Sequence, residues 1–418
     1  MNQKPKYWQF CKLGDVCHIN MGQSPPSSTY NTDKKGLPFF QGKAEFTELH
    51  PVAVKWCTEP KKIAQKDDIL ISVRAPVGST NVANQKCAIG RGLAAISFKY
   101  SNSYLWYYLK SIEKNLDNQG TGTTFKAISG NVLKSQIFPL APLPIQRAIV
   151  HKIENLFTSL DKGIADLKKA QQQLKVYRQA VLKKAFEGEY PTKKVIEFAD
   201  VKTGSTPKRG NPKYWENGTI PWVTSGALNN SYVNKADELI TEIALKETNC
   251  KIIPKGSLLV AMYGEGKTRG KCSELNIDAA SNQAIATITM FKEFIDSKNF
   301  VKWFFIKNYE EIRLLSSGGV QPNLNLSIVK NTVLPFPSLD IQHQIVREIE
   351  SRLSVCDKVE QNIAEGLEKS EALRQSILKK AFEGKLLNGA EIEKCKQEAD
   401  YEPASVLLEK IKKEKDGK

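Results

Sequence analysis

The sequence predicts an α+β fold in which two related domains of mixed strands and short helices are joined by two long helices. The two helices are expected to form an antiparallel coiled coil with pseudo-two-fold symmetry. Three observations predict this fold. They are the length of 418 residues, enough for two or three hydrophobic cores, a gap-free internal repeat, and a helical spacing of apolar residues within that repeat.

The repeat relates the two halves of the chain. FPLAPLPIQRAIVHKIENLF at 138–157 matches LPFPSLDIQHQIVREIESRL at 334–353, a shift of 196 residues. LKKAFEG occurs at 182–188 and again at 378–384. Of the 50 positions from 139 to 188, 19 are identical in the second copy. This similarity indicates a duplication of one unit.

A weaker similarity precedes each copy, where DVCHINMGQSP at 15–25 answers DVKTGSTP at 200–207 and GLPFF answers TIPWV. The shift drifts from 182 to 196 residues, which requires insertions and deletions of the kind that surface loops tolerate. The predicted organisation is a variable domain at 1–138, a long helix at 139–190, a second variable domain at 191–334, a second long helix at 335–388 and a charged, partly helical tail at 389–418.

Each copy of the repeat has the apolar spacing of a coiled-coil seam. Roughly 40 residues of helix would form a rod of about 60 Å. Pro144 falls in the first turn, and Gly188 and Gly384 are expected to adopt the left-handed conformation that ends many helices. The alternative is that each helix packs only against its own domain. The residues predicted to pair the helices or to bind a partner are Ile149, Ile153, Leu160, Leu167, Tyr177, Val181, Ile345, Ile349, Val359, Ile363 and Ile377.

Within the variable domains, DILISVR at 68–74 and SLLVAMY at 257–263 are predicted strands, because they are apolar, rich in β-branched residues and bounded by turn signals. Helices are predicted at 104–116 and 300–314. A loop rich in Gly, Thr or Asn then precedes each long helix, at 120–130 and 317–327.

Composition favours a polyanionic partner. The chain has 61 Lys and Arg against 45 Asp and Glu, a formal net charge of +16, and nucleic acid is the first candidate. The eight cysteines are scattered, with no CxxC pair, and are interpreted as reduced thiols. No run approaches the ~20 apolar residues that span a bilayer, and the first residues lack the pattern of a signal peptide. We expect a cytoplasmic protein without a membrane partner.

Two fragments resemble catalytic motifs. AMYGEGKT at 261–268 ends like a phosphate-binding loop, but it begins with Ala261 instead of Gly and no amphipathic helix follows it. Its counterpart at 73–80, VRAPVGST, has nothing of a phosphate loop, although Gly78 answers Gly270. NPKY at 211–214 lacks the second proline of the DNA amino-methyltransferase motif, and a turn is the preferred interpretation. The four histidines are too dispersed for a metal site, so we expect no catalytic and no metal-ligating residues.

The remaining candidates are polar and basic residues in loops. Arg and Gln form bidentate hydrogen bonds to base edges, while Lys, Ser and Thr more often hold phosphate oxygens. For each residue alone, a solvated surface position is the alternative. The predicted DNA-binding set is Gln23, Ser24, Lys43, Arg74, Arg91, Thr123, Thr124 and Lys126 in the first domain, and Thr206, Lys208, Arg209, Lys267, Arg269, Lys271 and Gln283 in the second.

This layout resembles the specificity subunit of type I restriction–modification systems. The resemblance rests on P-L-x-I-Q-x-x-I-V at 142–150 with its counterpart S-L-D-I-Q-H-Q-I-V at 338–346, on R-Q-x-[VI]-L-K-K-A-F-E-G at 178–188 and 374–384, and on G-x-[ST]-P at 22–25 and 204–207. It covers nearly the full chain.

The resemblance implies that each variable domain is a target recognition domain that reads one half of a split DNA sequence, and that the helices fix the separation. It also implies partners, namely double-stranded DNA, two modification (methyltransferase) subunits docked on the helices, and restriction or motor subunits. S-adenosylmethionine, ATP and Mg²⁺ would bind those partners, and this non-catalytic chain would bind no cofactor.

Two other functions stay open from the residues alone. A nucleotide-driven motor or a fused methyltransferase would bind ATP or S-adenosylmethionine as an isolated chain. A scaffold that joins proteins through its coiled coil would show a shallow salt dependence of DNA affinity, whereas a phosphate-contacting reader loses affinity steeply with salt.

Overall fold

The computed structural model describes residues 5–122, 126–263, 268–315 and 324–416, and the side chains of 310–315 and 416 are outside the description. The chain divides into two compact units, one formed by residues 1–167 and 365–418 and the other by 168–364. Each unit therefore contains one variable domain together with one end of both long helices.

The described part of the variable domain of the first unit contains two larger sheets and one two-stranded ladder. One has the order β2-β10-β7-β8 and contains the predicted strand 68–74 as β7. Every residue of β7 is buried, because the apolar sequence ILIS lies between two neighbouring strands and under helices. The bounds are β2 (His18–Met21), β7 (Ile69–Ser72), β8 (Thr80–Val82) and β10 (Leu93–Ser97).

The second sheet of this domain has the order β3-β5-β4-β9-β6 and includes one parallel pair, β4 with β9. Its strands are β3 (Tyr30–Asn31), β4 (Leu37–Phe40), β5 (Trp56–Cys57), β6 (Ile63–Ala64) and β9 (Cys87–Ile89). A separate ladder joins β1 (Gln9–Lys12) to β11 (Ile137–Leu140) and so connects the start of the domain to the strand that leads into the first long helix.

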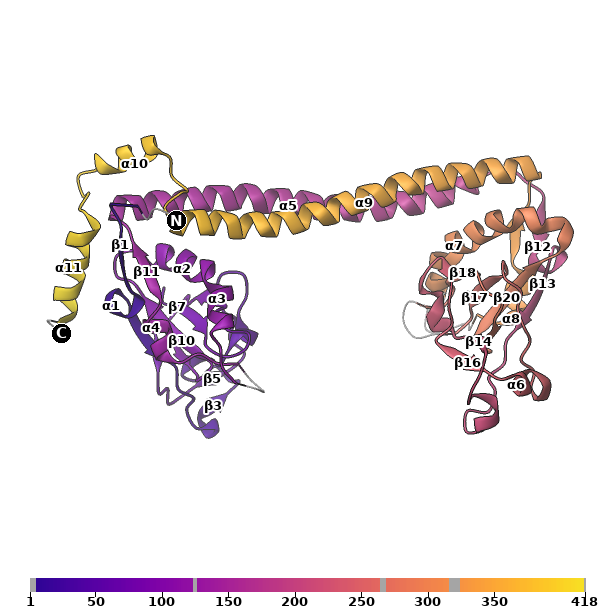
Figure 1. Cartoon of the computed structure of the whole chain (residues 1–418), viewed down its shortest axis with the longest axis horizontal. Helices are drawn as coiled ribbons and strands as arrows, with labels where there is room; N and C mark the ends of the chain where they lie inside the picture. Colours follow the sequence, from indigo (N-terminus) through magenta and orange to yellow (C-terminus); the bar gives the residue numbers. More distant parts are fainter. Residues whose placement is uncertain (1–4, 123–125, 264–267, 316–323, 417–418) are drawn as a thin grey trace. The chain divides into compact units, whose positions relative to one another are not determined.

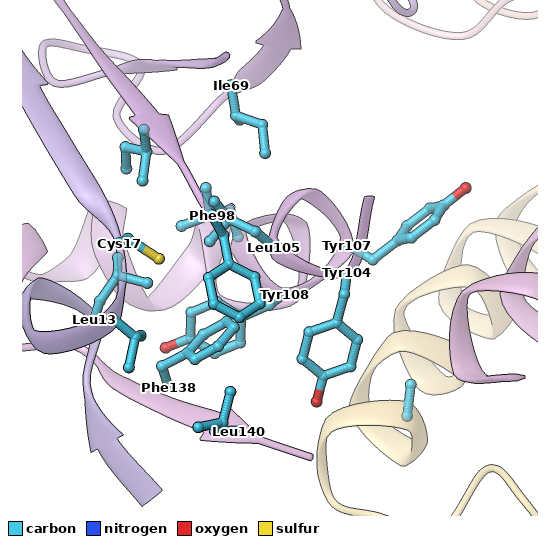
Figure 2. Close-up of a cluster of buried hydrophobic side chains, with 14 of the residues drawn as sticks. Leu13, Cys17, Ile69, Phe98, Tyr104, Leu105, Tyr107, Tyr108, Phe138 and Leu140 are labelled. Carbon is cyan, nitrogen blue, oxygen red and sulfur yellow. The ribbon is translucent and has the colours of Figure 1, made fainter. Parts of the chain in front are cut away.

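The predicted helix 104–116 is two helices, α2 (Asn102–Ser111) and α3 (Glu113–Asn118), with a break at Ile112. Two short helices, α1 (Leu13–Val16) and α4 (Gly130–Lys134), flank the sheet. The core gathers aromatic rings of α2 around Phe138 of β11, and Figure 2 shows them beside Leu13, Cys17 and Leu140. Tyr108 meets Phe138 edge to face at 5.0 Å, and the buried hydroxyl of Tyr104 donates to the carbonyl of Pro139 at 2.7 Å.

The second unit repeats this plan. Its larger sheet has the order β13-β20-β17-β18-β15, and β17 (Leu258–Ala261) is the predicted strand 257–263. The smaller sheet, β16-β14-β19, again has one parallel pair, β14 with β19. The remaining bounds are β12 (Thr192–Lys194), β13 (Ala199–Thr203), β14 (Ile220–Val223), β15 (Tyr232–Val233), β16 (Glu238–Ile240), β18 (Cys272–Leu275), β19 (Ala280–Ser281), β20 (Ile285–Met290) and β21 (Val333–Pro335).

Helix α7 (Lys298–Leu315) confirms the predicted helix 300–314, and short helices α6 (Glu242–Glu247) and α8 (Leu326–Asn331) complete the second domain. Phe300 and Phe304 pack on Phe186 at 5.1 and 5.5 Å. In the first unit, Tyr104 and Tyr108 pack on Phe382 in the same way, at 5.2 and 5.6 Å. These contacts are the same contact in the two repeats, because each residue pair is related by the shift of 196.

The two long helices are α5 (Leu143–Ala185) and α9 (Leu339–Phe382), of 43 and 44 residues. Within each unit they run side by side, as Figure 1 shows. In the first unit Arg374 pairs with Asp161, and in the second Arg178 pairs with Asp357 at 2.6 Å. The later residue of one helix thus meets the earlier residue of the other in both units, so the pairing is antiparallel as predicted.

In these two ion pairs, the helix that supplies the carboxylate and the helix that supplies the arginine are exchanged between the units. Residue 161 corresponds to 357, and residue 178 corresponds to 374, by the shift of 196. The acidic residue comes from α5 in the first unit and from α9 in the second. Each unit thus contains the same kind of bridge, with the roles of α5 and α9 reversed.

The two identical LKKAFEG segments end differently, and this corrects one prediction. Gly384 has φ 73°, and the N–H of Lys385 donates to Lys380 while the N–H of Gly384 donates to Ala381, which is a Schellman motif. Gly188 is not in the left-handed region. The ring of Tyr190 instead lies over it, where a Cβ atom would clash, so Gly188 serves close packing and not helix capping.

The tail forms two helices, α10 (Gly389–Lys396) and α11 (Ala404–Asp416), which pack on the first unit. Leu407 and Ile411 of α11 are buried in the same core as α1 and β11. Lys415 donates to the carbonyl of Cys17 at 3.0 Å, and Arg147 of α5 binds Glu398 and Asp400 at 2.7 and 2.8 Å. The tail is therefore an integral part of the first unit.

Candidate nucleic-acid interface

In each domain the G-x-[ST]-P segment directly follows a strand, β2 in the first domain and β13 in the second. It packs against the loop that carries the chain from the sheet with the parallel strand pair to the sheet that contains β2 or β13. A Cβ atom at Gly22 would clash with the carbonyl of Gly90, and one at Gly204 would clash with the carbonyl of Ser281. Both glycines are therefore required for the close approach of two backbones. Gly22 thus touches loop 90–92, and Gly204 touches Ser281, the last residue before loop 282–284.

Most of the predicted first-domain residues surround loop 90–92. The N–H of Gln23 donates to Ile89 at 3.1 Å, and the N–H of Arg91 donates to the hydroxyl of Ser24 at 3.2 Å. The N–H of Val73, which precedes Arg74, donates to the carbonyl of Gly92 at 2.9 Å. Gly42, which precedes Lys43, also lies close to Gly92.

Lys126 lies near Arg74. Its backbone carbonyl accepts a hydrogen bond from the N–H of Ala75, the residue after Arg74, at 3.0 Å. Its ammonium group pairs with Asp117 at 3.2 Å, so part of its charge is already balanced within the protein. Arg74, Arg91 and Lys43 are exposed. Thr123 and Thr124 lie outside the described residues.

In the second domain the structure brings Thr206 and Gln283 into contact. The hydroxyl of Thr206 donates to the side-chain oxygen of Gln283, and Gln283 is exposed. Lys271 is farther along the surface and donates to the side chain of Asn229 at 2.7 Å. Lys208 is exposed, and Lys267 lies outside the described residues. Arg269 is partly buried, and its Nε atom has no hydrogen-bond partner among the residues that the structure describes.

Arg209 is held by the protein itself. Its guanidinium contacts both carboxylate oxygens of Glu238 and stacks over Trp215 at 4.2 Å and Trp222 at 4.9 Å. The hydrogen bond to Arg209 lowers the pKa of Glu238, so the carboxylate stays charged. This arrangement fixes the guanidinium plane beside the turn that contains Thr206, because Trp222 donates to Ser205 at 3.1 Å.

The phosphate-loop resemblance has no structural support in the described residues. After β17 and residues 264–267, which are outside the description, the chain forms strand β18 from Cys272, whereas a phosphate loop leads into a helix. Gly78 and Gly270 are confirmed as equivalent, because each has positive φ and donates to its neighbouring strand, to Ser72 and to Ala261. NPKY forms a short turn in which Asn211 accepts from Lys213 at 3.3 Å, as predicted.

The cysteines are free and buried, which agrees with the prediction of reduced thiols. Burial raises the pKa of Cys11 to about 11 and that of Cys87 and Cys272 to about 12, so these groups are protonated near neutrality. Among the described residues, no three His, Cys, Asp or Glu side chains form a group that could hold a metal ion. The described helices include none long and apolar enough to cross a membrane.

The predicted pairing residues occupy two kinds of environment. Ile149, Ile153, Ile345 and Ile349 lie in the first turns of the long helices and join the cores of their own domains. Leu167 lies against Gly366 of the other helix, and Val181, Ile363 and Ile377 are buried. Two of the predicted residues are exposed, Tyr177 at 46% and Val359 at 39%. Leu160 is partly buried. Ile345 is also partly buried and packs against the core of the second unit.

Sequence reasoning missed the polar contacts of the helix pair. Asp161, Arg178, Asp357 and Arg374 were absent from the predicted set, although DK and RQ are identical in both copies of the repeat. Gln146 and Gln342 were also missed. Each is buried and donates to the backbone carbonyl five residues earlier, at 2.7 and 2.9 Å. Identity between the two copies at polar positions was the signal that would have found all six.

Comparisons with known proteins agree with this architecture. The profile of the family described as "Type I restriction modification DNA specificity domain" matches residues 5–170 and 187–369, which is one match for each variable domain with its helix. The type I restriction enzyme EcoBI specificity subunit of Escherichia coli is 23% identical, over 98% of this chain and 92% of that protein. A protein of Methanocaldococcus jannaschii, provisionally named the type I restriction enzyme MjaX specificity subunit, is 39% identical over 194 residues, 45% of each chain.

Two solved structures share the fold. A chain from a study of complex assembly in a type I restriction–modification system superposes with a TM-score of 0.74 at 18% identity, over 92% of this chain and 100% of that chain. The HsdS subunit of Thermoanaerobacter tengcongensis gives 0.60 at 18% identity, over 92% and 98%. With two family matches that follow its two units, the chain belongs to the family of type I restriction–modification DNA specificity proteins.

Proposed function

We propose that this chain is the DNA-reading subunit of a type I restriction–modification complex and has no catalytic activity of its own. Each target recognition domain reads one half of a bipartite DNA target. The long helices set the unread spacer and dock two methyltransferase subunits. The double family match, one for each domain with its helix, is the observation that carries this proposal.

The surface chemistry supports a DNA partner. The chain has a net charge of +16, and exposed Arg74, Arg91 and Lys43 surround one loop of the first domain. Cationic side chains of this kind neutralise phosphates, while arginine also reads guanine edges. The exposed amide of Gln283 supplies an adenine-reading group in the second domain.

The partners would supply the chemistry. S-adenosylmethionine would bind the methyltransferase subunits, and ATP and Mg²⁺ would bind restriction or motor subunits. The complex would act on chromosomal and invading DNA in the cytoplasm. In this arrangement the present chain contributes affinity, register and sequence choice, which are properties of rigid surface loops on a scaffold.

The methylome tests the proposal. The chain would be expressed with its neighbouring modification subunit in a host without adenine methylation, and single-molecule sequencing would be compared with a strain that lacks the chain. We expect a bipartite motif methylated on adenines in both halves only when the chain is present. An unchanged methylome from an assembled complex would instead favour a scaffold function. ATP or S-adenosylmethionine binding by the isolated chain would favour an enzyme.

A further inference from the structure

The loops 90–92 and 282–284 occupy the same place in the two target recognition domains. Each connects one strand of the parallel pair to the strand that is hydrogen-bonded to β2 or β13, from β9 to β10 and from β19 to β20. The first residue of each loop donates to the neighbouring strand, Gly90 to Phe40 at 2.8 Å and Asn282 to Val223 at 3.0 Å.

The carbonyl of the last residue of each loop accepts from the residue that directly follows β7 or β17. Val73 donates to Gly92 at 2.9 Å, and Met262 donates to Ala284 at 2.8 Å. The backbone hydrogen bonds on both sides of the loop are therefore the same in the two domains. The middle residues, Arg91 and Gln283, are structural equivalents, related by a shift of 192 residues that lies between the shifts of 182 and 196.

Both middle residues are exposed, and both touch the third residue of the G-x-[ST]-P turn. In the first domain the backbone N–H of Arg91 donates to Ser24, which leaves the guanidinium outside this contact. In the second domain the hydroxyl of Thr206 donates to the side-chain oxygen of Gln283. That bond uses one lone pair of the oxygen and fixes the plane of the amide, while the amide N–H₂ group keeps its donors.

We infer that this shared position reads one base in each half of the DNA target, with Arg91 directed to a guanine and Gln283 to an adenine. Arginine donates two hydrogen bonds to O6 and N7 of guanine. Glutamine accepts from N6 and donates to N7 of adenine, which the second lone pair and the amide N–H₂ of Gln283 satisfy. Thr206 is a positioning residue for Gln283. The inference rests on the proposed DNA-reading function and adds which residues select which bases.

The neighbouring residues suit this assignment. Arg74 and Lys43 beside loop 90–92 are exposed cations that would hold phosphates on either side of the base read by Arg91. Arg209, clamped by Glu238 and two tryptophans, offers no freely rotating guanidinium to the second half-site. Gln283 is consequently the better-placed base reader among the described residues around loop 282–284.

The test exchanges the two side chains. Arg91→Gln, Gln283→Arg and the double variant would each be expressed as the full chain with its modification subunit, and the methylomes would be read by single-molecule sequencing. The double variant has the wild-type net charge, so it separates base reading from general attraction to DNA.

We expect Arg91→Gln to replace a guanine requirement by an adenine preference at one position of one half-site, with the other half unchanged. Gln283→Arg should make the reverse change in the other half. Loss of one bidentate pair should lower methylation of the original sequence roughly 5- to 150-fold. Thr206→Val should weaken the adenine requirement and Thr206→Ser should preserve it, because serine keeps the hydroxyl.

Two results would overturn the inference while leaving the proposed function intact. One is a wild-type bipartite motif that persists unchanged in all three exchange variants. The other is a uniform loss of DNA affinity in Arg91→Gln with a smaller salt dependence and the same motif, which would identify Arg91 as a phosphate contact. A wild-type chain that directs no methylation would contradict the proposed function itself.

Discussion

At the scale of single residues, equivalent positions in the two repeats can be compared as if one were a substitution of the other. Tyr104 and Phe300 occupy equivalent positions, and both pack on the phenylalanine near the end of a long helix. Only Tyr104 has a hydroxyl, which donates to the buried carbonyl of Pro139. Phe300 thus shows that a ring at this position packs on the helix without a hydroxyl. The Tyr104 hydroxyl therefore adds one hydrogen bond to otherwise similar packing.

Tyr104→Phe should lower the free energy of unfolding by about 1 kcal/mol, because it removes one buried hydrogen bond without changing the packed ring. Chemical denaturation of the full chain measures this loss. Tyr263→Phe, at a residue 40% exposed, is the matched control and should change little. Equal stability of the Tyr104→Phe variant and the wild type would mean that the carbonyl of Pro139 finds another donor.

A second residue-scale feature is the buried cluster around Glu274. Burial alone would raise the pKa of Glu274, but hydrogen bonds and charges from Lys298 and Lys302 outweigh it and hold the pKa below its usual value. A folded-state pKa below that of the unfolded chain adds stability above the unfolded value, and this stability is lost as pH falls through the folded value. The cluster therefore contributes at neutral pH and fades in acid.

Glu274→Gln should be less stable than the wild type near neutrality, and the difference should shrink as the pH is lowered from about 6 to about 3. Unfolding free energies measured across this range provide the check. Glu242→Gln is the control, since Glu242 is exposed and meets Lys246 only at 3.9 Å. A constant difference at every pH would show that folding does not shift the pKa of Glu274.

At the scale of elements, the sequence predicted the long helices well because their pattern is local and duplicated. Strands β7 and β17 were also found, since each is a short apolar run with turns on both sides. The break at Ile112 was missed, because residues 102–118 contain no glycine or proline that would mark it. The sequence could not predict that the chain ends its helix differently at Gly188 and Gly384, because the LKKAFEG segments are identical and only the residues after them differ.

The tail was predicted to be charged and partly helical, but its docking on the first unit could not be foreseen from a segment in which charged residues dominate. Leu407 is 1% exposed and Val406, on the same helix, is 47% exposed. Leu407→Ala should cost roughly 2–5 kcal/mol in the first unit, whereas Val406→Ala should stay within about 0.5 kcal/mol. Hydrogen exchange at β1 and α1 checks this, since α11 packs on them. Unaltered exchange there in Leu407→Ala would refute the docking.

The candidate interface was predicted as a set of residue types, not as a geometry. Gln23, Ser24 and Arg91 were chosen for their chemistry, and the structure places them around one loop. No periodicity reveals that contact, because residue 91 reaches residue 24 only through the crossing of the chain between two sheets. The equivalence of Arg91 and Gln283 was hidden by the drift in the repeat shift.

At the scale of the whole molecule, we expect the length of the helix pair to determine the length of the unread DNA spacer. Four residues added near Gln171 in α5, together with four at the facing part of α9 near Glu365, lengthen both helices by about 6 Å. This is close to two base-pair steps. We expect a bipartite methylation motif with a spacer longer by one or two base pairs and with both half-sites retained, as read from the methylome. An unchanged spacer in an assembled complex would contradict the ruler function.

The exchanged ion pairs between α5 and α9 have an evolutionary consequence. Asp161 and Arg178 lie in one repeat, Asp357 and Arg374 in the other, and each bridge joins one residue from each. If gene conversion copied residues 150–188 over 346–384, both bridges would survive, because the donor carries the same two charges. Recombination inside the gene can therefore exchange the long helices without cost to their charge pairing, and the target recognition domains on either side are free to diverge.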